Sequence, residues 1–183
     1  IVGQAFFVSS GVLNANGIPS INDELLINLH HLQAPAAGKV YYAWLLRDRN
    51  QPTSTPIPLG MLTVKQGSVY DLYQGSLEHA NLLAITSRLL ITEEDIGSFP
   101  MSPAPDLSTV RYYAELSQNP DPNDAHHLSP LDHLRNLLAQ DPTLRVQDSH
   151  SNLAIWLLQQ TGRVLEWANS ARDYWNDGDT RLM

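Results

Sequence analysis

The stretch Lys39-Val-Tyr-Tyr-Ala-Trp-Leu-Leu-Arg47 carries the strongest strand signal in the chain. Successive side chains of a strand point to opposite faces, so Tyr42 and Trp44 share one face and Tyr41 and Ala43 share the other. Both faces are largely apolar here, whereas a strand with one face in water alternates apolar and polar residues. We therefore expect a central strand that is covered on both sides.

Further strand signals lie on either side of this stretch. Apolar or alternating runs predict strands at 1–9, 24–32, 59–65, 68–73, 82–87 with an extended continuation to 92, and 109–116. Loops rich in proline, glycine, serine and asparagine separate these runs. Gly60 marks a bulge or a close approach of another backbone. About seven short strands at this spacing predict an antiparallel β-sandwich over residues 1–118.

The hydrophobic period changes after the last of these strands. We predict a linker over residues 119–128 and a helical hairpin over residues 129–183, packed on the sandwich or on a partner. Ser129, Pro130 and Asp132 form a good helix start, because serine caps the helix, proline fits its first turn and aspartate favours its positive end. The fold class expected for the whole chain is α+β, and mainly β.

The second predicted helix runs from about residue 148 to about residue 176. Its apolar side chains fall on one side: Leu153, Trp156, Leu157, Val164, Trp167, Ala168, Ala171 and Trp175. Large apolar rings on an appended helix are typical of a docking surface. Trp156, Trp167 and Trp175 are therefore the candidate interaction residues, towards this chain's own sandwich or towards another chain.

Composition and charge exclude several classes of function. The 183 residues carry a net charge of −8, and the 11 basic residues form no cluster. Nucleic-acid binding needs a basic face to neutralise phosphates, so we do not expect it. The absence of cysteine excludes disulfides and thiolate chemistry. No apolar run approaches the roughly 20 residues that span a bilayer, so we expect no membrane insertion within this segment.

The histidines are the first candidate set of metal ligands. His126, His127 and His133 lie at and inside the first helix, and His150 heads the second. In a helical hairpin these rings could approach one another and bind a metal together with a nearby carboxylate. No ligand motif such as His-Glu-x-x-His is present, however, and a solvated helix entrance explains the same residues. We favour that simpler interpretation and expect no cofactor.

Recognisable catalytic motifs are missing as well. The acidic run 93–95 could supply paired carboxylates for acid–base chemistry or calcium, but we interpret it as a solvated strand edge. The sequence contains no Gly-x-Ser-x-Gly elbow, no dinucleotide-binding glycine pattern and no phosphate-binding loop. We therefore expect a protein that is not an enzyme. A hydrolase is a third hypothesis, for which we name no residues.

Three motifs follow one another in the middle of the chain, namely Tyr41-Tyr-Ala-Trp-Leu-Leu46, Leu59-Gly-Met-Leu62 and Leu83-Ala-Ile-Thr86, before an acidic and then a proline-rich stretch. This order resembles the extracytoplasmic domain of anti-sigma factors of the anti-sigma-K type. The Glu-Pro-Gly-Gly-Ser segment usual in that family is absent, and a helical tail is not part of that domain. The resemblance implies a β-sandwich outside the cytoplasm.

These observations lead to two hypotheses about function. The first is a non-enzymatic extracytoplasmic bacterial module that acts through protein–protein contacts, with a partner protein or by self-association. Such a module would be secreted, periplasmic or at the cell surface, either free or anchored through a segment outside this chain. The alternative is a small-ligand or metal-binding domain that uses His126, His127, His133 and His150.

Overall fold

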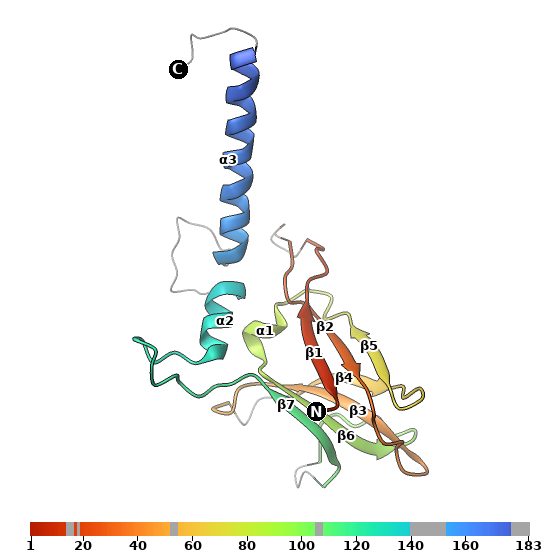
Figure 1. The fold of residues 1–183 in the computed structure, drawn as a ribbon. Helices are drawn as coiled ribbons and strands as arrows, with labels where there is room; N and C mark the ends of the chain where they lie inside the picture. The colour runs from red at the N-terminus through yellow and green to blue at the C-terminus, as the bar shows by residue number, and fades with distance from the viewer. Residues whose placement is uncertain (14–16, 18, 52–54, 105–107, 140–152, 177–183) are drawn as a thin grey trace.

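The computed structural model describes residues 1–13, 17, 19–51, 55–104, 108–139 and 153–176. Its elements in chain order are β1 (Gly3–Val8), β2 (Glu24–Leu29), β3 (Lys39–Leu46), β4 (Ile57–Leu62), β5 (Val69–Tyr73), α1 (Leu82–Ile85), β6 (Arg88–Asp95), β7 (Val110–Glu115), α2 (Pro130–Leu138) and α3 (Leu153–Asn176). Figure 1 shows the strands gathered in two sheets, with α2 and α3 beyond one end of them.

The seven described strands form two antiparallel sheets, in the orders β1-β2-β5 and β4-β3-β6-β7. This arrangement confirms the predicted fold class. β3 lies inside the larger sheet, and Tyr41 on one face and Trp44 on the other are both buried, as expected for a central strand. The core between the sheets consists of Leu25, Ile27, Leu29, Leu32, Tyr41, Ala43, Leu45, Leu62, Val69, Leu82, Leu89 and Ile91.

The predicted irregularity at Gly60 is a β-bulge between β3 and β4. Ala43 pairs with Gly60 and Trp44 pairs with Pro58, so Leu59 is an extra residue on β4. β4 is an edge strand, which explains why it tolerates a proline that cannot donate a ladder hydrogen bond. The strand therefore begins earlier than its apolar pattern suggested.

The prediction of a strand over residues 82–87 was wrong, because this segment begins with the short helix α1. Asn81 caps the helix by accepting a hydrogen bond from the Ala84 N–H at 3.1 Å. At the other end the Thr86 hydroxyl donates to the Leu82 carbonyl at 2.7 Å. A short apolar run fits a buried helical turn as well as a strand, and hydrophobic periodicity alone does not separate the two.

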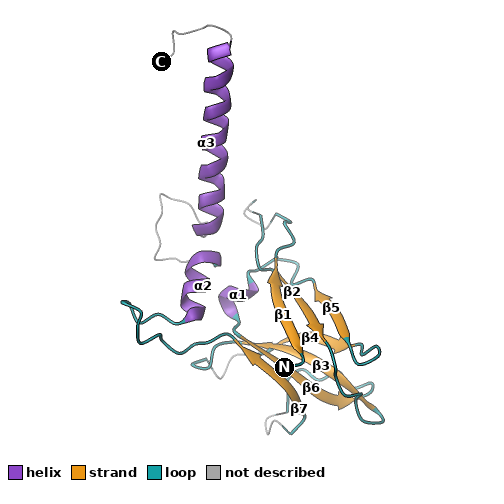
Figure 2. Cartoon of the chain, viewed as in Figure 1, coloured by secondary structure: helices purple, strands orange, loops and turns teal. Residues whose placement is uncertain are grey.

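The two C-terminal helices have different surroundings. α2 begins as predicted, with a capping box between Ser129 and Asp132. α3 contacts chiefly α2 and leads away from the sheets, so that α2 lies between α3 and the sandwich (Figures 1 and 2). Residues 148–152 of the second predicted helix lie outside the described residues. The division into 1–118, 119–128 and 129–183, and the hairpin itself, stay predictions.

Candidate functional site

A half-buried ion pair connects α2 to the sandwich. The Arg135 guanidinium donates to both carboxylate oxygens of Asp48, at 2.6 and 2.8 Å, and its Nε donates to the Leu83 carbonyl at 2.9 Å. Two parallel hydrogen bonds fix the orientation of both groups. Hydrogen bonds from Arg135 hold the pKa of the Asp48 carboxyl below its ordinary value, against the opposing effect of burial.

The two ends of α2 are fixed by further contacts. At the C-terminal end the Leu138 carbonyl accepts hydrogen bonds from the side-chain amides of Asn81, at 2.8 Å, and Asn22, at 3.3 Å. These amides satisfy an acceptor that has no partner within the helix. Near the other end Leu131 is almost completely buried. α2 is therefore held against the sandwich through Arg135 and through the carbonyl of Leu138.

The candidate residues of α3 lie on a helix whose side chains are mostly in water. Trp167 is 70% exposed and Trp175 is 69% exposed, whereas Trp156 is half-buried. They share the apolar face of α3, which we define as Leu153, Trp156, Leu157, Val164, Trp167, Ala168, Ala171, Tyr174 and Trp175. Large exposed apolar patches are a common feature of interaction sites. The structure places the three tryptophans on one helix.

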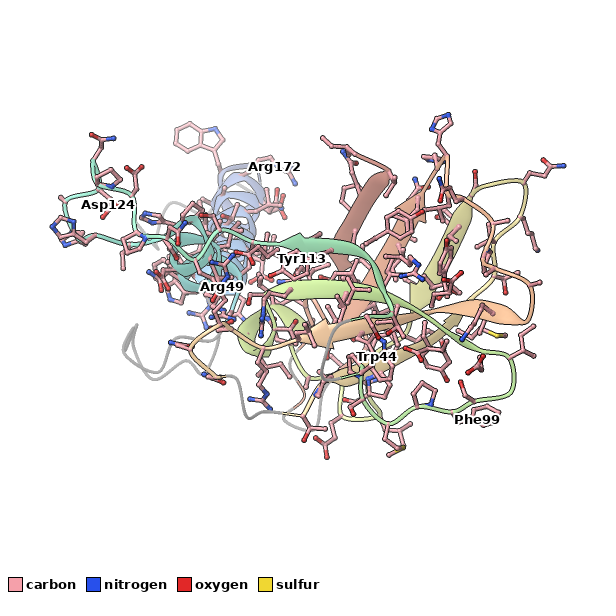
Figure 3. All side chains as sticks on the ribbon, turned by 90° about the horizontal axis from the view of Figure 1, so that it is seen from below. Trp44, Arg49, Phe99, Tyr113, Asp124 and Arg172 are labelled. Atoms are coloured by element: carbon pink, nitrogen blue, oxygen red, sulfur yellow. The ribbon has the colours of Figure 1, made fainter. Side chains whose placement is uncertain are left out.

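The histidines occupy the loop before α2 and the helix itself. His133 contacts Asp124 at 2.9 Å, and Asp124 also accepts a hydrogen bond from the His126 N–H at 2.7 Å. Figure 3 shows Asp124 projecting from this loop, to one side of the sandwich. Backbone hydrogen bonds from His126 and Leu128 lower the pKa of the Asp124 carboxyl. These contacts of Asp124 connect the loop to α2.

A metal centre finds no support in the described part of the chain. Within it, no three or more histidine, aspartate or glutamate side chains gather closely enough to hold a metal ion. His126 and His127 are exposed. His150, the fourth candidate ligand, lies outside the described residues.

The interpretation of residues 93–95 as a solvated edge was wrong for Glu93. This side chain is buried, accepts a hydrogen bond from the Ala36 N–H at 2.7 Å and pairs with the Arg111 guanidinium at 2.6 Å. The hydrogen bond from Ala36 is the main reason why the pKa of Glu93 is lowered. Both partners lie far from Glu93 in the sequence, so the acidic run alone could not reveal them.

A second buried carboxylate, Asp23, was not found by sequence reasoning. One of its oxygens accepts hydrogen bonds from the Ser10 hydroxyl at 2.6 Å and from the His79 ring at 2.8 Å. Burial alone would raise the pKa of Asp23, but the hydrogen bonds from Ser10 and His79 outweigh it, and the net shift is downward. Ser10 and His79 both bind the aspartate, so Asp23 links the loop after β1 to the loop before α1.

A groove of about 430 Å³ runs between β1 and β7, the neighbouring edges of the two sheets. Small residues on these strands, among them Gly3, Ala5 and Ala114, leave it open, and Leu89 and Ile91 form its floor. Arg111 also lines the groove, but it is committed to Glu93. Apart from Arg111, Gln4, Tyr112 and Tyr113 its lining is apolar, so the groove is suited to apolar contact.

Arg135 carried a signal that sequence reasoning did not use. It lies four residues after Leu131 and three before Leu138, so it falls on the apolar stripe of α2. A charged side chain on a buried stripe requires a partner of opposite charge. That partner, Asp48, comes from the distant loop after β3, and its identity required the structure.

Comparisons with protein-family models, with curated proteins and with solved structures find no match to the chain. Among the described residues, no helix combines the length and the hydrophobicity needed to cross a membrane.

Proposed function

We propose that this chain is a non-enzymatic extracytoplasmic module that acts through protein–protein contacts, similar to the sensory domains of anti-sigma factors of the anti-sigma-K type. The sandwich and α2 form the platform, and α3 presents the contact surface. The proposal rests on one observation: the apolar face of α3 carries two tryptophans, Trp167 and Trp175, that stay about 70% exposed on a helix leading away from the core.

The energetics of burial support this assignment. Fully burying a large apolar side chain contributes about 1.5–3 kcal/mol relative to leaving it in water. A helix that keeps several such side chains exposed gains this free energy only when another surface covers them. Tryptophan is also enriched among the residues that dominate binding free energy in protein interfaces.

The contacts elsewhere in the described chain favour a scaffold. The buried or half-buried ionisable groups Asp23, Asp48, Glu93 and Arg135 bind partners that join one element to another. Such links suit a platform. Glu93 also lines a cavity of about 520 Å³ together with His31, Tyr41 and its partner Arg111.

Site-directed photo-crosslinking tests the contact surface. A benzophenone amino acid replaces Trp167 in one variant and Leu158 in the other, and both are produced in the natural host cell. The two side chains are matched, since they are 70% and 69% exposed on the same helix, but only Trp167 belongs to the apolar face. We expect a discrete protein adduct from position 167 and much less from position 158. Equal adducts, or none, would reject the apolar face as a contact surface.

Labelling with a reagent that does not cross membranes tests the compartment. The chain contains no cysteine, so Leu165→Cys introduces a single exposed thiol. In intact cells, after permeabilising any outer membrane, we expect an impermeant maleimide to label this thiol as completely as in lysed cells. Labelling only after lysis would place the module in the cytoplasm and remove the extracytoplasmic part of the proposal.

A further inference from the structure

We infer that the apolar face of α3 pairs with the same face on a second copy of this chain, and that the two helices run antiparallel. The inference rests on the proposed function, because it names the partner of that contact surface. Two identical surfaces related by a twofold axis form the commonest kind of homodimer interface. Four features of α3 support this partner.

The first feature is the spacing of the side chains. Leu153, Leu157, Gln160, Val164, Trp167, Ala171 and Tyr174 follow one another at intervals of four and three residues throughout the helix. This alternation is the a/d pattern of a coiled coil, in which each side chain inserts between residues of a facing helix. We call these seven residues the stripe of α3. Gln160 is its one polar residue of this kind, and one polar core position is a common means of fixing register.

The second feature is the order of large and small side chains along the stripe. Antiparallel pairing about a point between Val164 and Trp167 places Val164 against the partner's Trp167. The same register places Leu157 against the partner's Tyr174, and Ala171 against the partner's Gln160. Each of these three layers then joins a larger side chain to a smaller one, which fills space evenly.

Parallel pairing would distribute the same side chains poorly. It places Trp167 against the partner's Trp167 and Ala171 against the partner's Ala171. Adjacent layers would then be overfilled and underfilled, and each mismatch destabilises a packed interface. The sequence of side-chain sizes therefore favours the antiparallel orientation.

The third feature is charge. The whole chain carries −8, so two copies repel each other over most of their surface. α3 contains two basic residues, Arg163 and Arg172, and two acidic residues, Glu166 and Asp173, so its own net charge is zero. None of the four occupies the stripe. The helix is thus an element at which two copies can meet without net repulsion.

The fourth feature is space and area. α3 leads away from the sheets, so antiparallel helices place the two sandwiches at opposite ends of the pair (Figure 1). Large aromatic side chains bury about 150–250 Å² each. Trp167, Tyr174 and Trp175 with the aliphatic residues of the stripe therefore approach the roughly 800 Å² per partner of a stable interface.

Sedimentation equilibrium of the full chain tests the pairing, with Val164→Glu as the disruptive variant. Leu165→Glu is the matched control, because Val164 is 60% exposed, Leu165 is 63% exposed, and Leu165 lies off the stripe. We expect the parent chain and the control to have twice the chain mass of 20.4 kDa, and Val164→Glu to be a monomer with unchanged circular dichroism. A monomeric parent chain, or dimers of all three, would overturn the inference.

Disulfide crosslinking tests the orientation. Leu157→Cys and Tyr174→Cys are made as separate variants, distinguished by a tag, and mixed under mild oxidation. Antiparallel pairing predicts disulfides between the two different variants and few within each. Parallel pairing predicts the reverse and would overturn the stated geometry.

The outcomes separate this inference from the function on which it rests. A parent chain that stays monomeric, while position 167 still gives an adduct with another protein, removes the self-pairing and retains the contact surface. A monomeric chain without any adduct removes both. Binding of that monomer to lipid vesicles, lost in Val164→Glu, would assign the face to a membrane surface instead.

Discussion

At the scale of single residues, the fold depends on a small set of paired charges. Arg135 is the clearest case, because its guanidinium joins Asp48, the Leu83 carbonyl and α2 in one contact. Replacing one member of such a pair leaves the other half-buried without its main partner. The exposed pair Arg172–Asp173 on α3 has no such consequence, since both groups are about two thirds exposed.

Arg135→Gln should lower the free energy of unfolding by about 2 kcal/mol, because the Asp48 carboxylate loses its bidentate partner. Arg172→Gln, the control, should change it by less than about 0.5 kcal/mol. Urea unfolding followed by fluorescence measures both. Equal effects of the two substitutions would show that the Arg135 contact does not stabilise the fold.

The acid stability of the protein should depend on the same pair. The folded-state pKa of Asp48 lies below its unfolded value, so its contribution to stability is present above that value, about 3.9, and is lost as the pH falls through the folded pKa. The unfolding free energy should therefore fall below about pH 4, and less steeply in Arg135→Gln. Parallel acid profiles of the two proteins would contradict this linkage.

Residue-level roles were the part of the site that the sequence predicted least. The partners of Glu93 and Asp23 come from Ala36, Arg111, Ser10 and His79, which are distant in sequence. The local sequence around an acidic residue on a strand is the same whether its carboxylate pairs with a remote arginine or is hydrated. The tryptophans of α3 were predictable as a set, because helical periodicity alone gathers them on one face.

At the scale of elements, the strands were predicted well because period-two patterns are local. The apolar pattern from Tyr41 to Leu46 predicts a strand that is buried on both faces without any information on the neighbouring strands. α1 was missed for the opposite reason, since its helical turn depends on the Asn81 cap and on the Thr86 hydroxyl. The pairing of strands into two sheets follows from long-range contacts that no local pattern specifies.

The start of α2 gives an element-level prediction. Ser129 is buried, and its hydroxyl exchanges hydrogen bonds with Asp132 in the capping box. Ser129→Ala should lower the free energy of unfolding by about 1 kcal/mol. Thr161→Ala, which removes an exposed hydroxyl bonded within α3, is the control and should have little effect. Thermal unfolding by circular dichroism compares the two, and indistinguishable midpoints would contradict the role of the cap.

At the scale of the whole molecule, the contacts of α2 indicate where the stable unit ends. Asn22, Asn81 and Asp48 all use α2 as their partner, and each belongs to the sandwich or its loops. A chain cut after residue 139 keeps these contacts, whereas a chain cut after residue 118 loses them all. The sequence placed the linker between those two points, because it could not show that α2 docks.

Truncation tests this division directly. Residues 1–139 should fold cooperatively and remain monomeric, because they retain the docked helix and lack α3. Residues 1–118 should unfold at a clearly lower urea concentration, since several polar groups lose their partners at once. Urea titration and light scattering measure these properties. Equal midpoints would mean that α2 adds nothing to the sandwich.

The groove between β1 and β7 affects how the native state opens locally. Among the described strands β1 pairs with β2 only, whereas β3 and β6 have neighbours on both sides. Gly3 and Ala5 of β1 have small side chains and contribute little packing on the side of the groove. In deuterium oxide the amides of β1 should therefore exchange soonest among the strands and those of β6 last, as separate opening units. Detachment of β1 would then expose Leu89 and Ile91 at the floor of the groove. Mass spectrometry of peptic fragments would measure the order in which the strands exchange.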